Sequence, residues 1–224
     1  MDRLTLKNPN FFYDKNDFPY LSSLELQWEL IFEELDNLIK LNKKSFWLNT
    51  FPDYVTSENN EAWKVFSFLF FKMKSPKHAK LCPFTSNLIF HIPEIISCDY
   101  SLLPAKTKIN PHKGYSKMIL RCHLPLIVPQ GEKCGIKVGD KVHYWKTGEL
   151  VIFDDSYTHE AWNDSDEDRF VLMFDIPNPR WGYSSYEISK YKVEHLDDPF
   201  LLGIANKETW LKAFKDQVLP LEEF

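Results

Sequence analysis

The chain has 224 residues and a formal net charge of −5, and it is 44% hydrophobic and 16% aromatic. That length allows one domain with a sizeable core, and the apolar content excludes a disordered chain. Basic and acidic side chains are mixed along the sequence without a basic stripe. We therefore expect no nucleic-acid partner.

Apolar runs, the N-terminal pattern and cysteine spacing indicate where in the cell the protein is expected. The richest apolar run, VFSFLFF at 65–71, falls short of the ~20 residues that span a bilayer, so we expect no membrane span. The N-terminal residues carry no signal-peptide pattern. The four cysteines are widely spaced and form no CxxC pair. They indicate reduced thiols in a cytoplasmic protein rather than a zinc site.

Helical patterns are concentrated in the N-terminal part, after an extended aromatic segment at 1–20. Apolar residues recur at helical spacing over Ser22–Leu41, where Ser22 and Glu25 form a candidate capping box. The next predicted elements are a helix at Asn59–Trp63, a strand at Trp63–Phe71 and a helix at Thr85–Ile92.

From residue 95 the pattern changes to short strands. The dipeptide Gly139-Asp140 lies between two of them and predicts a hairpin turn. Several short strands without intervening helices predict an all-β sandwich or barrel. The tail from residue 186 holds a predicted helix at Lys207–Val218 and is expected outside that core. The predicted strands are Ile95–Leu103, Thr107–Asn110, Lys117–Val128, Gly135–Val138, Lys141–Trp145, Glu149–Asp154, Glu160–Asn163 and Arg169–Ile176.

Two of these strands carry charged or titratable side chains on one face. Period-2 alternation puts Arg121 and His123 on one side of their strand, opposite Leu120 and Cys122. A buried charge without a partner is costly, so this face is either a solvated edge or the wall of a cavity that receives an anion. Arg169 begins the last predicted strand, and its two parallel donors match a carboxylate.

His112 and His159 form a candidate metal pair. Non-haem iron oxygenases commonly hold Fe(II) with two histidines and a carboxylate. The carboxylate usually lies two residues after the first histidine, where this chain has Gly114. Asp154 and Asp155 are further candidates for a third ligand, although FDDS is also typical of a strand that ends in a turn.

Three other interpretations remain open from these residues. One is a zinc or three-histidine site that adds His123 to His112 and His159. Another is a carboxylate-binding module without catalysis. The third is a structural interaction protein whose tail mediates contacts.

Five motifs together resemble the aspartyl/asparaginyl β-hydroxylases, a branch of the Fe(II)- and 2-oxoglutarate-dependent oxygenases. The resemblance covers 97–179 well and the N-terminal part more loosely. It implies a mainly β fold with a double-stranded β-helix (jelly-roll, cupin-like) core at 95–180, helical or extended decoration at 1–94 and a tail at 181–224, all in one oxygenase domain. The motifs are PHKG, LRCHLPLIVP, KCGIKVG, WKTGELVIFDDSYTHEAWN and DRFVLMFDIPNP.

The resemblance also assigns expected roles. Glycine at position 114 fits a family in which two histidines, here His112 and His159, hold iron and water completes the face. His123 corresponds to a residue that contacts the C1 carboxylate of 2-oxoglutarate. Ser101 and Arg169 correspond to the pair that grips its distal carboxylate.

Arg121 corresponds to a catalytic-site arginine that faces an acidic substrate side chain. The expected activity is hydroxylation of an unactivated C–H bond in an aspartyl/asparaginyl-like amino acid, a peptide or another small polar substrate. The alternatives are a lipid A acyl-chain hydroxylase-like enzyme or a non-catalytic carboxylate-binding module on the same fold.

Overall fold

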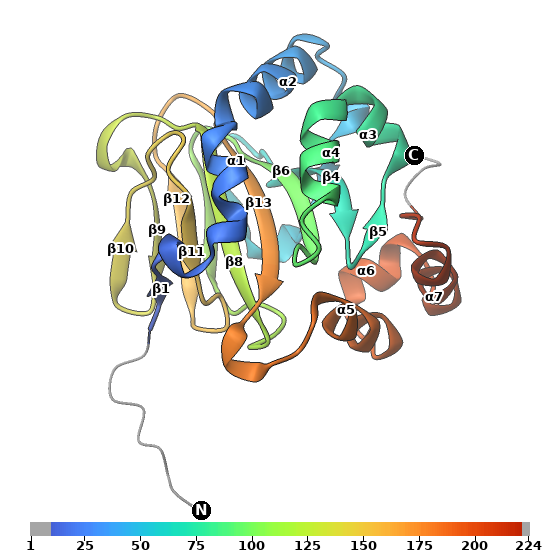
Figure 1. The fold of residues 1–224 in the computed structure, drawn as a ribbon. Coiled ribbons are helices and arrows are strands. Elements are labelled where there is room, and N and C mark those ends of the chain that lie inside the picture. Colours follow the sequence, from blue (N-terminus) through green and yellow to red (C-terminus); the bar gives the residue numbers. More distant parts are fainter. Residues whose placement is uncertain (1–9, 221–224) are drawn as a thin grey trace, which may run out of the picture.

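The computed structural model describes residues 10–220 and contains two antiparallel sheets that face each other (Figure 1). The larger sheet has the order β1-β11-β8-β13-β6-β4-β2, with β5 paired to β4, and the smaller has the order β10-β9-β12-β7-β3. The fold is therefore a β-rich, two-sheet jelly roll with flanking helices, which confirms the predicted fold class. The first nine residues of the segment predicted to be extended lie outside the described part.

The strands agree with most of the ranges predicted from alternation, and short additional strands extend both sheets. In the larger sheet they are β1 (Phe12–Tyr13), β2 (Leu48–Asn49), β4 (Lys64–Phe70), β5 (Met73–Lys74), β6 (Ser97–Leu103), β8 (Ile119–Ile127), β11 (Val151–Phe153) and β13 (Arg169–Pro177). In the smaller sheet they are β3 (Val55–Ser57), β7 (Thr107–His112), β9 (Cys134–Val138), β10 (Lys141–His143) and β12 (His159–Asn163). Strands from the 1–94 segment thus belong to both sheets.

Helices cover the outer face of the larger sheet (Figure 1). Leu120, Cys122 and Leu124 of β8 point into this layer, as the alternation predicts. Arg121 and His123 therefore point the other way, toward the smaller sheet. The covering helices are α1 (Ser22–Leu26), α2 (Trp28–Lys40), α3 (Pro76–Leu81) and α4 (Pro83–Phe90).

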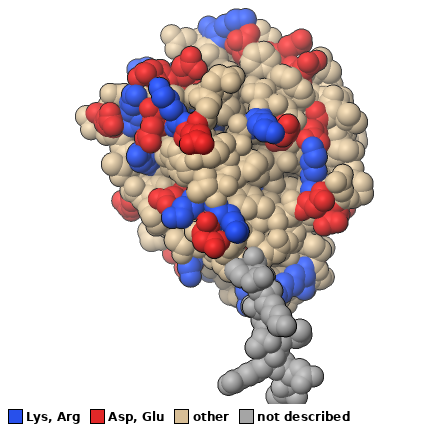
Figure 2. Space-filling model, turned by 90° about the vertical axis from the view of Figure 1, so that its left-hand side faces the viewer, with Lys and Arg blue, Asp and Glu red and all other residues tan. Residues whose placement is uncertain are grey.

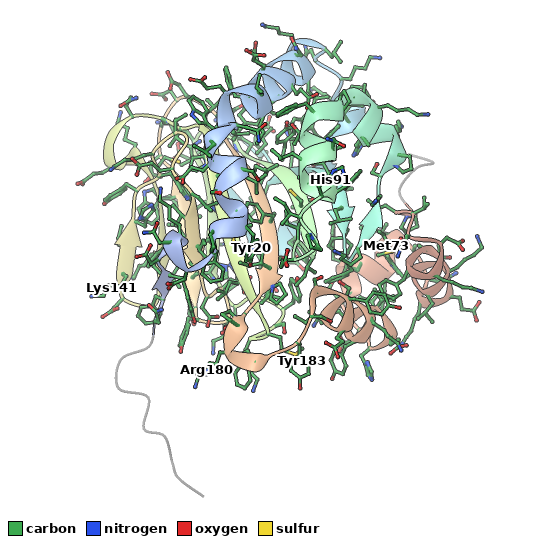
Figure 3. The ribbon with its side chains drawn as sticks, viewed as in Figure 1. Tyr20, Met73, His91, Lys141, Arg180 and Tyr183 are labelled. Carbon is green, nitrogen blue, oxygen red and sulfur yellow. The ribbon has the colours of Figure 1, made fainter. Side chains whose placement is uncertain are left out.

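The C-terminal tail packs against one end of the sheets. Its helices are α5 (Ser185–Glu194), α6 (Pro199–Ile204) and α7 (Lys207–Asp216). Trp210 is buried with Met73 and Ile119, and Figure 3 shows Met73 beside these helices. The backbone N–H of Leu219 donates to the carbonyl of Lys74 (2.8 Å), which fixes the end of α7 to β5.

Two helix predictions differ from the structure. The predicted helix at 22–41 is interrupted at Gln27, and the capping box is wrong because Glu25 instead accepts a hydrogen bond from the Leu150 backbone N–H (2.9 Å). The predicted helix at 59–63 is also wrong. The hydroxyl of Ser57 accepts hydrogen bonds from the backbone of Asn59 and Glu61, and this local turn competes with helix formation.

The surface shown in Figure 2 carries acidic and basic side chains interspersed. Such mixing produces no extended field of one sign on that face. Within residues 10–220, every helix is too short or too polar to cross a bilayer. The four cysteines are free and buried.

Replacement of Trp210 by alanine tests whether the tail belongs to the cooperative fold. Trp210 is 1% exposed, and its Nε1–H donates to the Leu201 carbonyl (3.0 Å). We expect Trp210→Ala to lower the free energy of unfolding by about 3–5 kcal/mol in urea titrations. Leu211→Ala, at a position 38% exposed, should cost about 1 kcal/mol or less. Equal stability of the two variants would show that the tail folds independently.

Candidate active site

The smaller sheet brings the two candidate metal ligands together. His112 ends β7, His159 begins β12, and the two residues are direct partners in the antiparallel register. Their ring centroids lie 4.2 Å apart, with the ring planes inclined by 54°. Tyr54, from a short 3-10 helix at Pro52–Tyr54, stacks on the His112 ring at 4.8 Å. The pairing predicted from sequence is therefore present in space.

Both imidazoles have Nδ1 directed at a backbone carbonyl. The Nδ1 atom of His112 lies 2.7 Å from the Asn110 carbonyl, and that of His159 lies 3.0 Å from the Tyr157 carbonyl. Because a carbonyl can only accept, Nδ1 carries the proton and Nε2 keeps its lone pair. Burial lowers the pKa of His112, and burial together with His112 lowers the pKa of His159 to about 3. Both rings are thus neutral at physiological pH, as metal ligation requires.

Gly114 lies against Asp155. Its backbone N–H donates to the Asp155 carbonyl (2.7 Å), and a Cβ at position 114 would lie only 2.2 Å from the Asp155 carboxylate carbon. The structure therefore has no room for a side chain where the usual three-ligand pattern places an acid. Across residues 10–220, no cluster of three or more His, Cys, Asp or Glu side chains could hold a metal. The three-histidine interpretation with His123 has no geometric support.

Asp155 itself is a buried carboxyl that sequence reasoning weighed only as a ligand. Its oxygens have no hydrogen-bond partner among the described residues, and Arg121 Nη1 lies 3.4 Å from Oδ2. Burial raises the pKa of Asp155 to about 7, while Arg121 acts in the opposite direction. Asp155 packs against Gly114 and lies beside Arg121, and no local sequence motif predicts this position.

A small cavity beside His159 contains a buried arginine. Arg169, His123, Ser101 and Trp63 line a small cavity of about 30 Å³ beside His159. Arg169 is 1% exposed, and its Nε has no hydrogen-bond partner among the described residues. Burial lowers its pKa to about 10, so the guanidinium still carries its charge at neutral pH. A buried cation without a partner is costly, which indicates that an anionic ligand completes the site.

The neighbours of Arg169 offer further hydrogen bonds. Both ring nitrogens of His123 are buried and unpaired within the described residues, and burial lowers the pKa of this ring well below its usual value. Ser101 Oγ accepts from Trp63 Nε1 (2.9 Å), so the serine proton remains free to donate. The family resemblance assigned Ser101 and Arg169 to one carboxylate of 2-oxoglutarate and His123 to the other, and the structure brings all three residues to one cavity.

Arg121 has partners within the protein. Its Nε and Nη2 donate to Asp175 (2.9 and 3.1 Å), which faces it across the β8–β13 pair. Two carboxylates, Asp175 and Asp155, therefore balance this guanidinium before any substrate arrives. Its role toward an acidic substrate stays a prediction.

A larger cavity of about 440 Å³ opens beside the histidine pair. His112, Gly114 and Arg121 lie along it, and its volume is within the range of about 300–1,000 Å³ typical of small-molecule sites. Sequence reasoning missed this cavity because α5 and α6 of the tail close it. Its larger apolar side chains include Phe51, Tyr54, Phe70, Phe71, Phe200 and Leu201.

The jelly roll thus places two neutral imidazoles beside a cavity that contains a buried arginine, an arrangement compatible with a metal-dependent oxygenase. A profile of the Aspartyl/Asparaginyl beta-hydroxylase family matches residues 25–179. The chain belongs to this family, which confirms the resemblance seen in its motifs. The residues present are compatible with iron and 2-oxoglutarate, because both imidazoles have Nδ1 on a backbone carbonyl and Nε of the buried Arg169 has no hydrogen-bond partner within the described residues.

Two curated relatives show how far the similarity extends. The Ornithine lipid ester-linked acyl 2-hydroxylase of Rhizobium tropici is 31% identical over 205 residues, covering 90% of this chain and 73% of that protein. The Aspartyl/asparaginyl beta-hydroxylase of Homo sapiens is 30% identical over 165 residues, covering 71% of this chain but 21% of that protein. Among solved structures, a Pseudomonas putida prolyl-4-hydroxylase has a TM-score of 0.45 and 13% identity, over 67% of this chain and 86% of that one.

The contact between Gly114 and Asp155 predicts the effect of one added methyl group. Gly114→Ala should lower the free energy of unfolding by about 1–3 kcal/mol in urea titrations, because the buried Asp155 must move. Gly203→Ala in α6 is the matched control, since nothing lies within 4 Å of its added Cβ. That control should be neutral or more stable, given the helix propensity of alanine. Similar stability of both variants would refute the close packing at position 114.

The unpaired guanidinium predicts a variant whose stability and binding change in opposite directions. Arg169→Met should raise the melting temperature of the ligand-free protein, because it removes a buried charge without a partner. It should also abolish the stabilisation by 2-oxoglutarate, which in the parent amounts to about 2.7 kcal/mol at a hundred times Kd. Thermal unfolding with and without 2-oxoglutarate measures both effects.

Arg180→Met is the control for that experiment, since Arg180 is exposed and lies outside the cavity (Figure 3). This variant should keep the full response to 2-oxoglutarate. If Arg169→Met kept it as well, the anion would bind elsewhere.

Proposed function

We propose that this chain is an Fe(II)- and 2-oxoglutarate-dependent hydroxylase that acts on the acyl chain of a polar lipid. The observation that carries the substrate class is the apolar cavity beside His112, whose walls include Phe51, Phe200 and Leu201. The relative from Rhizobium tropici, which covers most of this chain, is named for acyl hydroxylation of a lipid. Both observations favour the lipid alternative over an aspartyl or asparaginyl substrate.

The metal and co-substrate would use the side chains described above. His112 and His159 would hold iron through Nε2, and their Nδ1 contacts with backbone carbonyls would keep the rings in that tautomer. Arg169 and Ser101 would bind the distal carboxylate of 2-oxoglutarate, with His123 on the other carboxylate. When bound, iron and 2-oxoglutarate supply the oxidising power that converts C–H to C–OH.

The remaining cavity residues would position the substrate and exclude water. The aromatic and aliphatic walls favour a hydrocarbon chain because its transfer from water is favourable, at roughly 25 cal/mol per Å². An acidic amino-acid substrate would have to compete with Asp175, which already takes two hydrogen bonds from Arg121. This internal pairing supports the lipid as the substrate.

Replacement of His159 tests the metal role. His159→Ala should reduce iron-dependent succinate formation from 2-oxoglutarate to background and weaken iron binding measured under anaerobic conditions. His91→Ala is the control, because His91 is exposed at the end of α4 and away from the cavity (Figure 3). Full activity in His159→Ala would remove this residue from the metal site.

The same assay tests the substrate class. Incubation with iron, ascorbate, 2-oxoglutarate and either a set of polar acyl lipids of differing head-group charge or an aspartyl peptide should give a hydroxylated product, detected by mass spectrometry, only from a lipid. A hydroxylated peptide in place of lipid would favour the amino-acid substrate and overturn the proposal.

A further inference from the structure

The large cavity has a polar floor beneath its apolar walls. Ser67 of β4, Asp99 of β6 and Met173 of β13 are direct partners across three neighbouring strands. Their side chains belong to the inner face of the larger sheet, and both polar residues line the cavity. Asp99 is therefore a buried carboxyl group in a cavity with large apolar side chains, which Asp175, Asp197 and Asp198 also line.

Asp99 has an unused hydrogen-bond acceptor. It is 7% exposed, and its Oδ1 has no partner within the described residues. Burial raises its pKa to about 7, with Asp175 acting in the same direction and both Ser67 and Arg121 in the opposite one. A buried carboxyl with a free oxygen is costly, so its position is explained if a ligand donates to it.

No cation that lines the cavity forms an ion pair with Asp99, although Arg121 lowers its pKa from a distance and His195 Nδ1 lies 2.9 Å from the Tyr191 carbonyl. The donors of Arg121 are directed to Asp175 (2.9 and 3.1 Å). Lys192 Nζ donates to the Tyr115 carbonyl (2.9 Å), and Lys113 is exposed. The floor of the cavity therefore offers an unused acceptor, and a cation bound beside it would stabilise the ionised form of the carboxyl.

We propose that Asp99 is the recognition point for an ammonium group of the substrate, while the walls formed with α5 and α6 hold its acyl chain. The inference rests on the proposed function and narrows the lipid to one whose polar part carries a positively charged nitrogen. An ammonium fits better than a hydroxyl, because it supplies both a donor and the missing charge. An anionic head group would place like charges together in a low-dielectric space.

Binding of three probes with the same chain length tests this inference without iron. Decylamine, decanol and decanoate, each below its micellar concentration, can be titrated by calorimetry into the metal-free protein saturated with 2-oxoglutarate, which occupies Arg169 and keeps decanoate from that site. We expect decylamine to bind at least tenfold more tightly than decanoate, a difference of about 1.4 kcal/mol. Equal affinity for the amine and the carboxylate in the parent protein would overturn the proposal, and this comparison needs no variant.

Asp99→Asn then identifies the residue responsible. The variant should lose at least tenfold in decylamine affinity and keep its affinity for decanol, because the walls are unchanged. Asp166→Asn, in an exposed turn, should behave as the parent does. Unchanged amine binding in a folded Asp99→Asn protein would overturn the assignment.

Turnover is measured separately, as succinate formed with iron and 2-oxoglutarate in the parent protein. Absence of turnover on any acyl lipid would contradict the proposed function, whereas absence of amine preference would contradict only the role of Asp99. The two failures are therefore distinguishable.

Discussion

The antiparallel register of β13 with β8 and β6 determines which side chains reach the interior. Asp175 is opposite Arg121, and Met173 is opposite both His123 and Asp99. Since successive strand residues alternate between faces, a slip of one residue would move this polar set under the helices and the leucines into the cavity. Burial of the apolar face against α1, α2 and α4 opposes such a slip, and the same burial that stabilises the fold thus positions the site.

The two buried arginines differ in whether the protein itself supplies carboxylate partners for them. Arg121 is balanced by Asp175 and Asp155, which ties β8 to β13 and to the segment after β11. Arg169 has only the Trp145 ring beneath it, at 4.9 Å, and no carboxylate within the described residues. The free energy that the fold gives up by burying Arg169 unpaired is recovered only when an anion binds.

Much of this arrangement could be predicted from the sequence. Period-2 alternation over nine residues identified β8 and β13, and with them the faces of His123 and Arg169. The strands of two or three residues, such as β2 and β3, are too short to show a period. Glu25, which was expected to cap the first helix, accepts from Leu150 instead, and no local pattern contains this contact.

The residues of the candidate site also differ in whether the sequence could predict them. Histidine and arginine side chains stand out on apolar strands, so the metal pair and the anion cavity were accessible from residue types and from the family resemblance. Asp99 did not stand out, because an acid on a strand is ordinary until its neighbours across the sheet are known to be Ser67 and Met173. The C-terminal tail was predicted only to lie outside the core, because its contribution to the site becomes visible only when α5 and α6 are seen to line the cavity.

The close approach of Gly114 and Asp155 links the metal pair to the paired charges. A side chain at position 114 is excluded by Asp155, and Asp155 is held 3.4 Å from Arg121. The absence of a side chain at position 114 is therefore enforced by the same carboxyl that lies beside Arg121. Because Nε and Nη2 of Arg121 are directed to Asp175, Asp99 keeps an oxygen without a partner within the described residues, and the proposed preference for a positively charged substrate depends on this division of the charges.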